Sequence, residues 1–194
     1  MRNQTIRQHR GFTLVELLIV IAIIMVLAAL GFAGVQSALK KARTVQTLNL
    51  VTNTSQAIHN FFDEYGSLPT ANATPAPINT NSAEGVNVLR VLLAQEGVGD
   101  TALNTKGIRY LDVKTAKARK AGVEFAAGGT VVTAMYDAWG DPLYMAFDED
   151  YNDEILNPIP NSPADPQIIR GMKAIVYSYG ADRTERSKDD VRSW

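Results

Sequence analysis

The stretch of sequence that decides the fold reads Arg10-Gly11-Phe12-Thr13-Leu14-Val15-Glu16-Leu17-Leu18, and it opens a long apolar run. From Leu17 to Val35 no side chain is charged or strongly polar, and the apolar character extends back to Phe12 if Thr13 and Glu16 are included. As a helix, the 24 residues from 12 to 35 would be about 36 Å long, enough to cross a hydrocarbon layer of about 30 Å. The sequence therefore predicts a membrane span over residues 12–35.

A secretory signal peptide is the alternative for this N-terminus. Its apolar core has only about 7–15 residues and is followed by a small-residue cleavage site, whereas this run is longer. The basic residues on the two sides of the run are nearly balanced, with Arg2, Arg7 and Arg10 before it and Lys40, Lys41 and Arg43 after it. Because a long C-terminal domain translocates largely regardless of its charge, we expect the N-terminus to be cytoplasmic.

The helix is expected to continue beyond the span, because apolar residues recur there at spacings of three and four. These residues are Val35, Leu39, Ala42, Val45, Leu48, Val51, Ile58, Phe61, Phe62 and Tyr65. No proline occurs before Pro69, so residues 13–65 could form one helix about 80 Å long. Gly66 followed by Pro69 predicts the helix end, and the segment 36–65 is predicted to be its amphipathic second half.

A globular head is predicted over residues 66–194. Residues 70–85 are small and polar, which indicates a surface loop, and a short helix is predicted over 86–96. Three segments rich in β-branched and aromatic residues predict strands, namely Thr130–Tyr136, Leu143–Phe147 and Ala174–Tyr179. A small antiparallel sheet of these strands, packed on the second half of the helix, would give an α+β fold.

The composition excludes several functions. Three of the 19 basic residues precede Gly11, so removal of residues 1–11 leaves 16 basic and 20 acidic residues, a net charge of −4. This balance lacks the basic surface that a nucleic-acid partner requires. There is no cysteine, so thiolate metal sites and cysteine nucleophiles are excluded, and of the two histidines only His59 could serve a catalytic triad.

Glu16 is the unusual residue of the apolar run. A carboxylate inside a membrane span costs about 2.5–3.5 kcal/mol on insertion scales, so it should have a partner or a purpose. No cation lies within the span itself. If the chain were cut after Gly11, the new α-amino group of Phe12 would offer a positive charge to the Glu16 carboxylate of a neighbouring subunit.

This N-terminal segment closely resembles the leader and first helix of type IV pilins and of the pseudopilins of type II secretion. The resemblance implies that a prepilin peptidase cuts between Gly11 and Phe12, that Phe12 is N-methylated, and that Glu16 guides subunits into a filament. Many family members have a proline in the second half of the span, where this chain has Gly31-Phe32-Ala33-Gly34. Each glycine weakens a helix by about 1 kcal/mol relative to alanine.

Three further segments resemble the pseudopilin branch and in particular its major subunit. They are the helix end Phe61–Pro69, the Asp-x-Trp-Gly-x-Pro turn Asp137–Pro142 and the tail Tyr177–Trp194. In the major pseudopilins this tail binds calcium, which takes six to eight oxygen ligands. The resemblance implies a calcium site with carboxylates from Asp182, Asp189 and Asp190 and further oxygens from Tyr179, Thr184 and Ser193. The alternative is an acidic tail neutralised by its own cations, which are Arg183, Arg186, Lys188 and Arg192.

Two other charged runs are predicted to be solvated. Residues 148–159 begin like an EF-hand loop, but Asp153 stands where glycine is needed and Ile159 where a bidentate glutamate is needed. Lys114–Lys120 is predicted to be a turn or loop whose charges need no ligand.

The resemblance implies a structural subunit of a type II secretion pseudopilus and not an enzyme. Before assembly it would be held in the bacterial inner membrane, with the head in the periplasm. Its partners would be membrane lipid, further copies of itself, other pseudopilins, the prepilin peptidase and an inner-membrane assembly platform. One alternative is a type IV pilin for adhesion, motility or DNA uptake, although many such pilins have a C-terminal disulfide. Another is a membrane-anchored periplasmic enzyme that uses acids around residues 137–153.

Overall fold

The computed structural model describes residues 12–71, 74–97 and 102–194, without the side chains of residues 30–34. The predicted leader over residues 1–11, with Gly11, lies outside the described residues, and so do the side chains around Gly31 and Gly34. The chain divides into two compact units, Met1–Lys41 and Ala42–Trp194, and each is treated by itself below.

Helix α1 extends from Leu14 to Tyr65 and confirms the predicted long N-terminal helix. It ends as the sequence indicates, because Gly66 has a φ of 65°, in the left-handed region, and its N–H donates to the Phe62 carbonyl over 2.7 Å. Pro69 follows three residues later and is buried. The boundary between the two units falls within this helix, after Lys41.

In the first unit, the apolar side chains of α1 are exposed. The large ones between Phe12 and Leu27 have exposed fractions from 44% at Val20 to 80% at Leu14. Among the parts of the chain that the structure describes, no helix combines the length and the apolar character that a membrane crossing requires. Residues 30–34 of the predicted span 12–35 have no described side chains.

In the second unit, one face of α1 is buried and contributes to the core. This face comprises Thr47, Leu50, Val51, Thr54, Ala57, Ile58 and Phe61. The predicted apolar stripe was wrong at Ala42, Val45 and Leu48, which are exposed, Val45 to 49% and Leu48 to 42%. Thr47 and Thr54 are buried instead, and their hydroxyls have hydrogen-bond partners: Thr47 accepts from the distant Ala138 N–H, and Thr54 donates to the Leu50 carbonyl one turn earlier.

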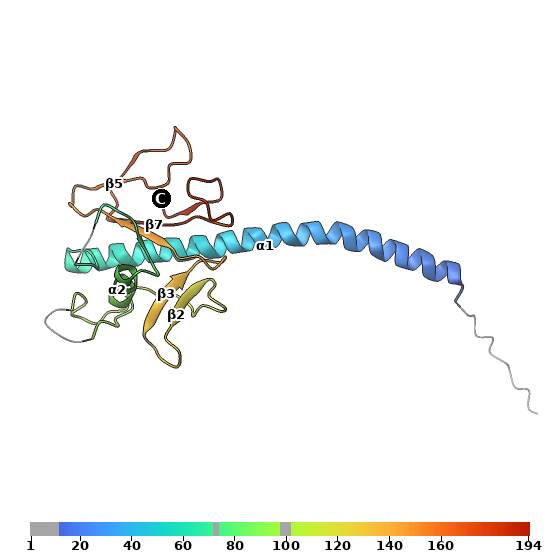
Figure 1. Cartoon of the computed structure of the whole chain (residues 1–194), viewed down its shortest axis with the longest axis horizontal. Coiled ribbons are helices and arrows are strands. Elements are labelled where there is room, and N and C mark those ends of the chain that lie inside the picture. The colour runs from blue at the N-terminus through green and yellow to red at the C-terminus, as the bar shows by residue number, and fades with distance from the viewer. Residues whose placement is uncertain (1–11, 72–73, 98–101) are drawn as a thin grey trace, which may run out of the picture. The chain divides into compact units, whose positions relative to one another are not determined.

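The second unit holds antiparallel strands, as predicted (Figure 1). A four-stranded sheet has the order β1-β4-β7-β8, with β1 at Ile78–Asn79, β4 at Tyr144–Phe147, β7 at Ala174–Ser178 and β8 at Val191–Arg192. Two ribbons accompany it: β2 (Gly122–Phe125) with β3 (Val132–Tyr136), and β5 (Glu154–Leu156) with β6 (Ile168–Arg170). The expectation of one sheet from three strands was therefore wrong for Thr130–Tyr136, which pairs with β2.

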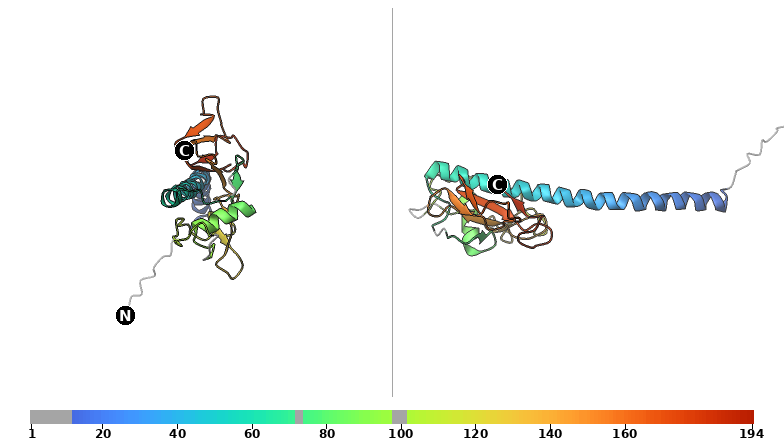
Figure 2. Two further views of the ribbon diagram at one scale, coloured as in Figure 1. Left: turned by 90° about the vertical axis from the view of Figure 1, so that its left-hand side faces the viewer. Right: turned by 90° about the horizontal axis from the view of Figure 1, so that it is seen from above.

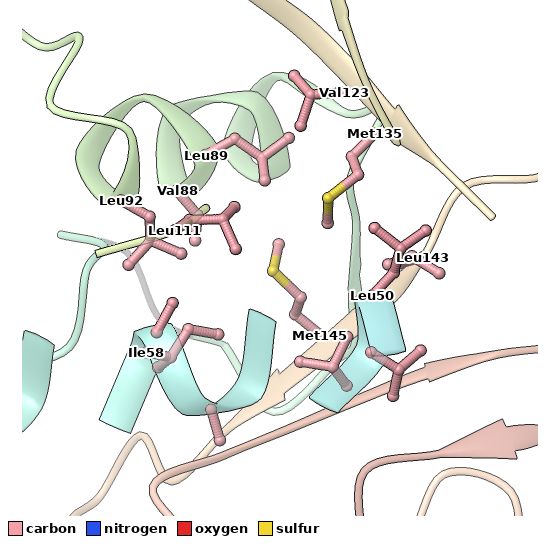
Figure 3. Close-up of a cluster of buried hydrophobic side chains, with 14 of the residues drawn as sticks. Leu50, Ile58, Val88, Leu89, Leu92, Leu111, Val123, Met135, Leu143 and Met145 are labelled. Atoms are coloured by element: carbon pink, nitrogen blue, oxygen red, sulfur yellow. The ribbon is translucent and has the colours of Figure 1, made fainter. Parts of the chain in front are cut away.

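Helix α2 covers Ala83–Leu92, so it begins and ends earlier than predicted. Ser82 caps it, because its hydroxyl accepts from the Gly85 N–H over 3.1 Å. Within the expected loop 70–85, Ile78 and Asn79 pair with Met145 and Tyr144 as strand β1. Figure 3 shows the core where α1 and α2 meet the strands, with Leu50, Ile58, Val88, Leu89, Leu92, Leu111, Val123, Met135, Leu143 and Met145.

Candidate functional site

The start of α1 is organised around Glu16. The Thr13 N–H and the Thr13 hydroxyl both donate to Glu16 Oε2 over 2.8 Å, and the Glu16 N–H donates to the Thr13 hydroxyl over 3.2 Å. This is a capping box, in which a Thr at the helix N-cap and a Glu three residues later satisfy each other's backbone donors. The Thr-x-x-Glu spacing is the sequence signal for this contact. The prediction had considered only a cation as the partner of Glu16 and had not included Thr13.

The capping box lies entirely on the C-terminal side of the predicted cut. Phe12 is 78% exposed and is followed directly by the capping residue Thr13. Removal of residues 1–11 would therefore leave the helix cap intact. Within the described residues, all hydrogen bonds to the Glu16 carboxylate fall on Oε2, so Oε1 is left for another donor.

The apolar surface that follows Glu16 is the largest exposed feature of the first unit. Thirteen large apolar side chains from Phe12 to Leu27 are exposed, and Glu16 is the single charged residue among them. Each Å² of apolar surface removed from water contributes about 25 cal/mol, so a continuous helix face of this kind strongly favours burial against lipid or other apolar helices.

In the second unit, Asp137 organises the Asp-x-Trp-Gly-x-Pro turn. Its side chain is fully buried, and Oδ1 accepts from the N–H groups of Trp139, Gly140 and Asp141 over 2.8, 2.8 and 3.0 Å. The other oxygen, Oδ2, accepts from the Ser178 hydroxyl over 2.6 Å. The turn and the start of the C-terminal tail are thus joined through one carboxylate, which is saturated with hydrogen bonds.

The three acids of the tail gather around Ser187. The Ser187 hydroxyl lies 2.7 Å from Asp189, 3.3 Å from Asp182 and 3.5 Å from Asp190. Asp189 also accepts from the N–H groups of Ala181 and Asp182 over 2.7 and 3.1 Å. The approach is close, since a Cβ on Gly180 would lie 2.2 Å from the Asp189 carbonyl oxygen.

Burial and hydrogen bonding act in opposite directions on these acids. Burial raises the pKa of Asp190 above its ordinary value, because it disfavours the charged form. Burial acts in the same sense on Asp189, but the bonds from Ser187, Asp182 and Ala181 outweigh it and hold the pKa of Asp189 below its ordinary value.

The other predicted calcium ligands are placed differently. Thr184 lies with the acids, because its N–H donates to Asp182 Oδ1 over 2.9 Å. The Ser193 hydroxyl accepts from the Val176 N–H, and the ring of Tyr179 packs on that of Tyr144 at 4.5 Å. Over residues 12–71, 74–97 and 102–194, no three acidic or histidine side chains are grouped so that they could hold a metal ion.

The tail arginines are directed to other acids. Arg183 pairs with Asp141 at 2.7 Å and Arg192 with Asp165 at 2.9 Å. In the described part of the chain, Asp182, Asp189 and Asp190 take part in no ion pair within 4.0 Å. The ion pairs of Arg183 and Arg192 are therefore formed with acids outside the tail and not with Asp182, Asp189 or Asp190.

The second acidic run is only partly solvated, which differs from the prediction. Asp148 is fully buried and pairs with Lys173 at 2.8 Å, and Lys173 also reaches Asp153 at 2.5 Å. A lysine ammonium thus supplies the positive charge at this loop. His59 is likewise occupied, with Nδ1 at 2.7 Å from the Ser55 carbonyl and Nε2 accepting from the Lys173 N–H.

The N-terminal segment of the chain matches a known family model. The Prokaryotic N-terminal methylation motif matches residues 6–32. The chain is 32% identical over 94 residues to prepilin peptidase-dependent protein D of Escherichia coli (strain K12), which is 46% of this chain and 64% of that protein. It is 31% identical over 101 residues to fimbrial protein EcpC of Eikenella corrodens, covering 52% of this chain and 66% of that one.

A third relative is the type IV major pilin protein PilE of Neisseria gonorrhoeae, 28% identical over 100 residues. The match covers 52% of this chain and 59% of that pilin, so the chain spans less than two thirds of the length of each of these relatives. No solved structure matches the chain. The motif, the relatives and the long helix followed by antiparallel sheets make this chain a member of the type IV pilin-like superfamily.

Proposed function

We propose that this protein is a structural subunit of a type II secretion pseudopilus. It is cleaved between Gly11 and Phe12, N-methylated at Phe12, and assembled through its N-terminal helix into a periplasmic filament that drives protein export. Before assembly it is held in the bacterial inner membrane, with a cytoplasmic N-terminus and a periplasmic head. One observation carries the proposal: an exposed apolar helix surface with one acid, Glu16, directly follows the predicted cut after Gly11. That cut lies within residues 6–32, which the methylation motif matches.

Processing is tested by the intact mass of the full chain recovered from membranes of cells that contain a prepilin peptidase. The expected mass lacks residues 1–11 and includes one additional methyl group. A Gly11→Leu variant is the matched control and should keep the leader. A wild-type chain that retains its leader beside an active peptidase would contradict the processing step.

A type IV pilin for adhesion, motility or DNA uptake is the second candidate, and the names of two relatives, a fimbrial protein and a type IV major pilin, favour it. The absence of cysteine and the junction of the Asp137 turn with Ser178 support the pseudopilin, whose resemblance lies in these segments. Introducing the gene into a secretion-defective strain that lacks its major pseudopilin separates the two. Restored export supports the pseudopilin, whereas surface filaments without export support the pilin.

Calcium binding by the tail is part of the proposal. The carboxylates of Asp182, Asp189 and Asp190 lie around the Ser187 hydroxyl and belong to no ion pair of the described residues. This arrangement supports the site, since calcium is bound mainly by carboxylate and carbonyl oxygens and by water. When bound, the ion would supply positive charge to this loop, and Thr184 lies beside it.

Calcium binding is measured as a shift in the melting temperature of the full chain in detergent. We expect about 1 mM CaCl₂ to raise the melting temperature by several degrees, because a ligand that binds only the folded state stabilises it. The same concentration of MgCl₂ should raise the melting temperature less. Asp189→Asn should remove the calcium shift, while Asp150→Asn, outside the tail, should retain it. Equal curves with calcium and with EDTA would contradict the site.

The proposal includes no catalytic activity. The two buried acids between residues 137 and 153, Asp137 and Asp148, are both committed to hydrogen bonds and, for Asp148, to Lys173. Turnover by the purified full chain that disappears on substitution of Glu149 or Asp150 would support the enzyme alternative.

A further inference from the structure

A cationic turn on the second unit carries four basic side chains, of which Arg119 is influenced by the carboxylate of Glu124. The turn comprises Lys114, Lys117, Arg119 and Lys120, all exposed, and residues 114–120 contain no acid. Arg119 donates to the Tyr136 hydroxyl over 2.6 Å and lies over that ring. In the described residues the three lysines form no ion pair within 4.0 Å.

The cationic turn is exposed, as predicted, and its backbone is held in a fixed conformation. Lys117 and Lys120 exchange backbone hydrogen bonds of 3.3 and 3.1 Å around Ala118 and Arg119, whose φ values are 50° and 58°. Positive φ at both central positions is typical of a type I′ turn, where glycine or asparagine is usual. Further bonds, from Ala116 N–H to the Val123 carbonyl and from Ala121 N–H to the Asp137 carbonyl, fix its base. A surface charge pattern that is already ordered loses little entropy on binding.

An acidic loop of the same unit has the complementary charge. It comprises Glu149, Asp150, Asp153 and Glu154, of which Asp153 pairs with Lys173 and Glu154 with Arg170. Glu149 and Asp150 have no ion pair in the described residues, and Glu149 Oε2 is buried without a hydrogen-bond partner. Burial raises the pKa of Glu149, and the neighbouring charges of Asp150 and Asp148 raise it further, so a nearby cation would stabilise this loop.

The cationic turn and the acidic loop lie on opposite sides of α1. The turn leads directly into β2 and the acidic loop directly into β5. Figure 1 shows β2 and β5 on the two sides of the C-terminal part of α1, and the left view of Figure 2 shows the same separation. Two complementary surfaces on opposite sides of one subunit could form a heterologous, head-to-tail interface, which generates a ring where the rotation closes and an open helical filament where it does not.

We propose that the cationic turn of one subunit binds the acidic loop of a second copy of this chain, with Lys117 and Asp150 at the centre of the contact. The inference rests on the proposed function, because it concerns the contact between heads in the same filament. Charge complementarity of this kind sets register and favours the correct partner, and the contribution of each exposed pair is modest. Repetition along the filament multiplies that contribution.

The test is a charge swap in the full chain, expressed with its assembly machinery. Lys117→Glu and Asp150→Lys should each reduce the amount of sedimentable filament about fivefold, which corresponds to about 1 kcal/mol for one exposed pair. The double variant should recover to within about twofold of wild type, because each subunit again presents opposite charges. Arg109→Glu, an exposed substitution outside both surfaces and outside the tail, is the matched control and should assemble as wild type.

Each other outcome has a defined meaning. An undiminished amount of filament from Lys117→Glu would overturn the contact. A double variant as defective as the single variants would also overturn it and would indicate that the turn binds lipid headgroups or another protein. An equal loss with Arg109→Glu would attribute the effect to net charge and would also overturn it. A wild-type chain that is processed but never sedimentable would contradict the proposed function itself, which distinguishes the two failures.

Discussion

The two halves of α1 differ in what they do with their apolar side chains. Between Leu14 and Leu27 these side chains are exposed, whereas between Leu50 and Phe61 they form one wall of the core. The exposed positions between residues 44 and 62 are uncharged, since this stretch contains no Asp, Glu, Lys or Arg. Helix formation is common to both halves. The first half therefore needs a partner outside the chain, and the second half already has its partner within it.

The largest expected effect concerns the first half. Glu16→Ala should reduce filament formation at least about tenfold while leaving cleavage intact, because the charge that meets a neighbouring amine is lost. Glu16→Gln is the matched variant, since it can keep the bonds to Thr13 but not the charge, and it should be as defective. Electron microscopy and sedimentation measure filaments, and intact mass measures cleavage. Normal filaments from either variant would remove the role of the charge.

The next largest effect concerns the second half. Phe61 is fully buried and its ring packs on Tyr65 at 4.6 Å and on Tyr110 at 5.5 Å, so Phe61→Ala should lower the free energy of unfolding by about 3–5 kcal/mol. Ile24→Ala, on the exposed half, should change it by less than about 0.5 kcal/mol. Chemical denaturation of the full chain in detergent gives both values. Similar losses in the two variants would show that the halves do not differ in this way.

Alkaline pH is expected to perturb the packing of Tyr110 on Phe61 to a smaller extent. Burial, together with the neighbouring Tyr65 and Glu64, raises the pKa of Tyr110 to about 12. Because the folded-state pKa lies above the unfolded value of about 10, the neutral phenol stabilises the fold fully below pH 10, and this stability is lost as the pH rises towards 12. Burial also raises the pKa of Tyr177, so some alkaline loss should persist in Tyr110→Phe. Melting temperatures of both proteins between pH 8 and 12 check this, and parallel curves would contradict it.

The smallest effect is expected on the outer face of the second half. Leu48→Ala should change the free energy of unfolding by less than about 0.5 kcal/mol, because Leu48 is 42% exposed. Val51→Ala, one turn away and fully buried, should cost about 1–3 kcal/mol. A large loss from Leu48→Ala would show that the core face of the helix is rotated from its described position.

The sequence predicts the elements that have a local cause. The helix end follows from Gly66 and Pro69, and the strands β3, β4 and β7 follow from runs of β-branched and aromatic residues. The strands β1 and β8 have two residues each, too few for any periodicity, and they exist because Ile78 pairs with Met145 and Val191 with Ser178. Contacts between residues so distant in the chain leave no local pattern.

The predicted functional residues likewise divide into those with a contiguous sequence pattern and those without one. Gly11, Phe12 and Glu16 form a contiguous pattern, and the match to residues 6–32 recovers the family it indicates. The stretch 114–120 was predicted to be a turn or loop, but its tight backbone conformation could not be predicted, because Ala118, Arg119 and Ala121 adopt positive φ without being glycine or asparagine. The core face of α1 was displaced in prediction because Thr47 and Thr54 are buried through hydrogen bonds, which hydrophobicity alone does not anticipate.

The capping box at the start of α1 has a thermodynamic consequence for polymerisation. Glu16 Oε2 already accepts two hydrogen bonds from Thr13, whereas Oε1 accepts none among the described residues. A donor from an added subunit would therefore add a bond at Oε1 without breaking the helix cap. In the proposed membrane-held state lipid already covers the apolar side chains, so transfer into a filament would bring little further hydrophobic gain, and close packing and polar contacts would decide the stability of the assembly.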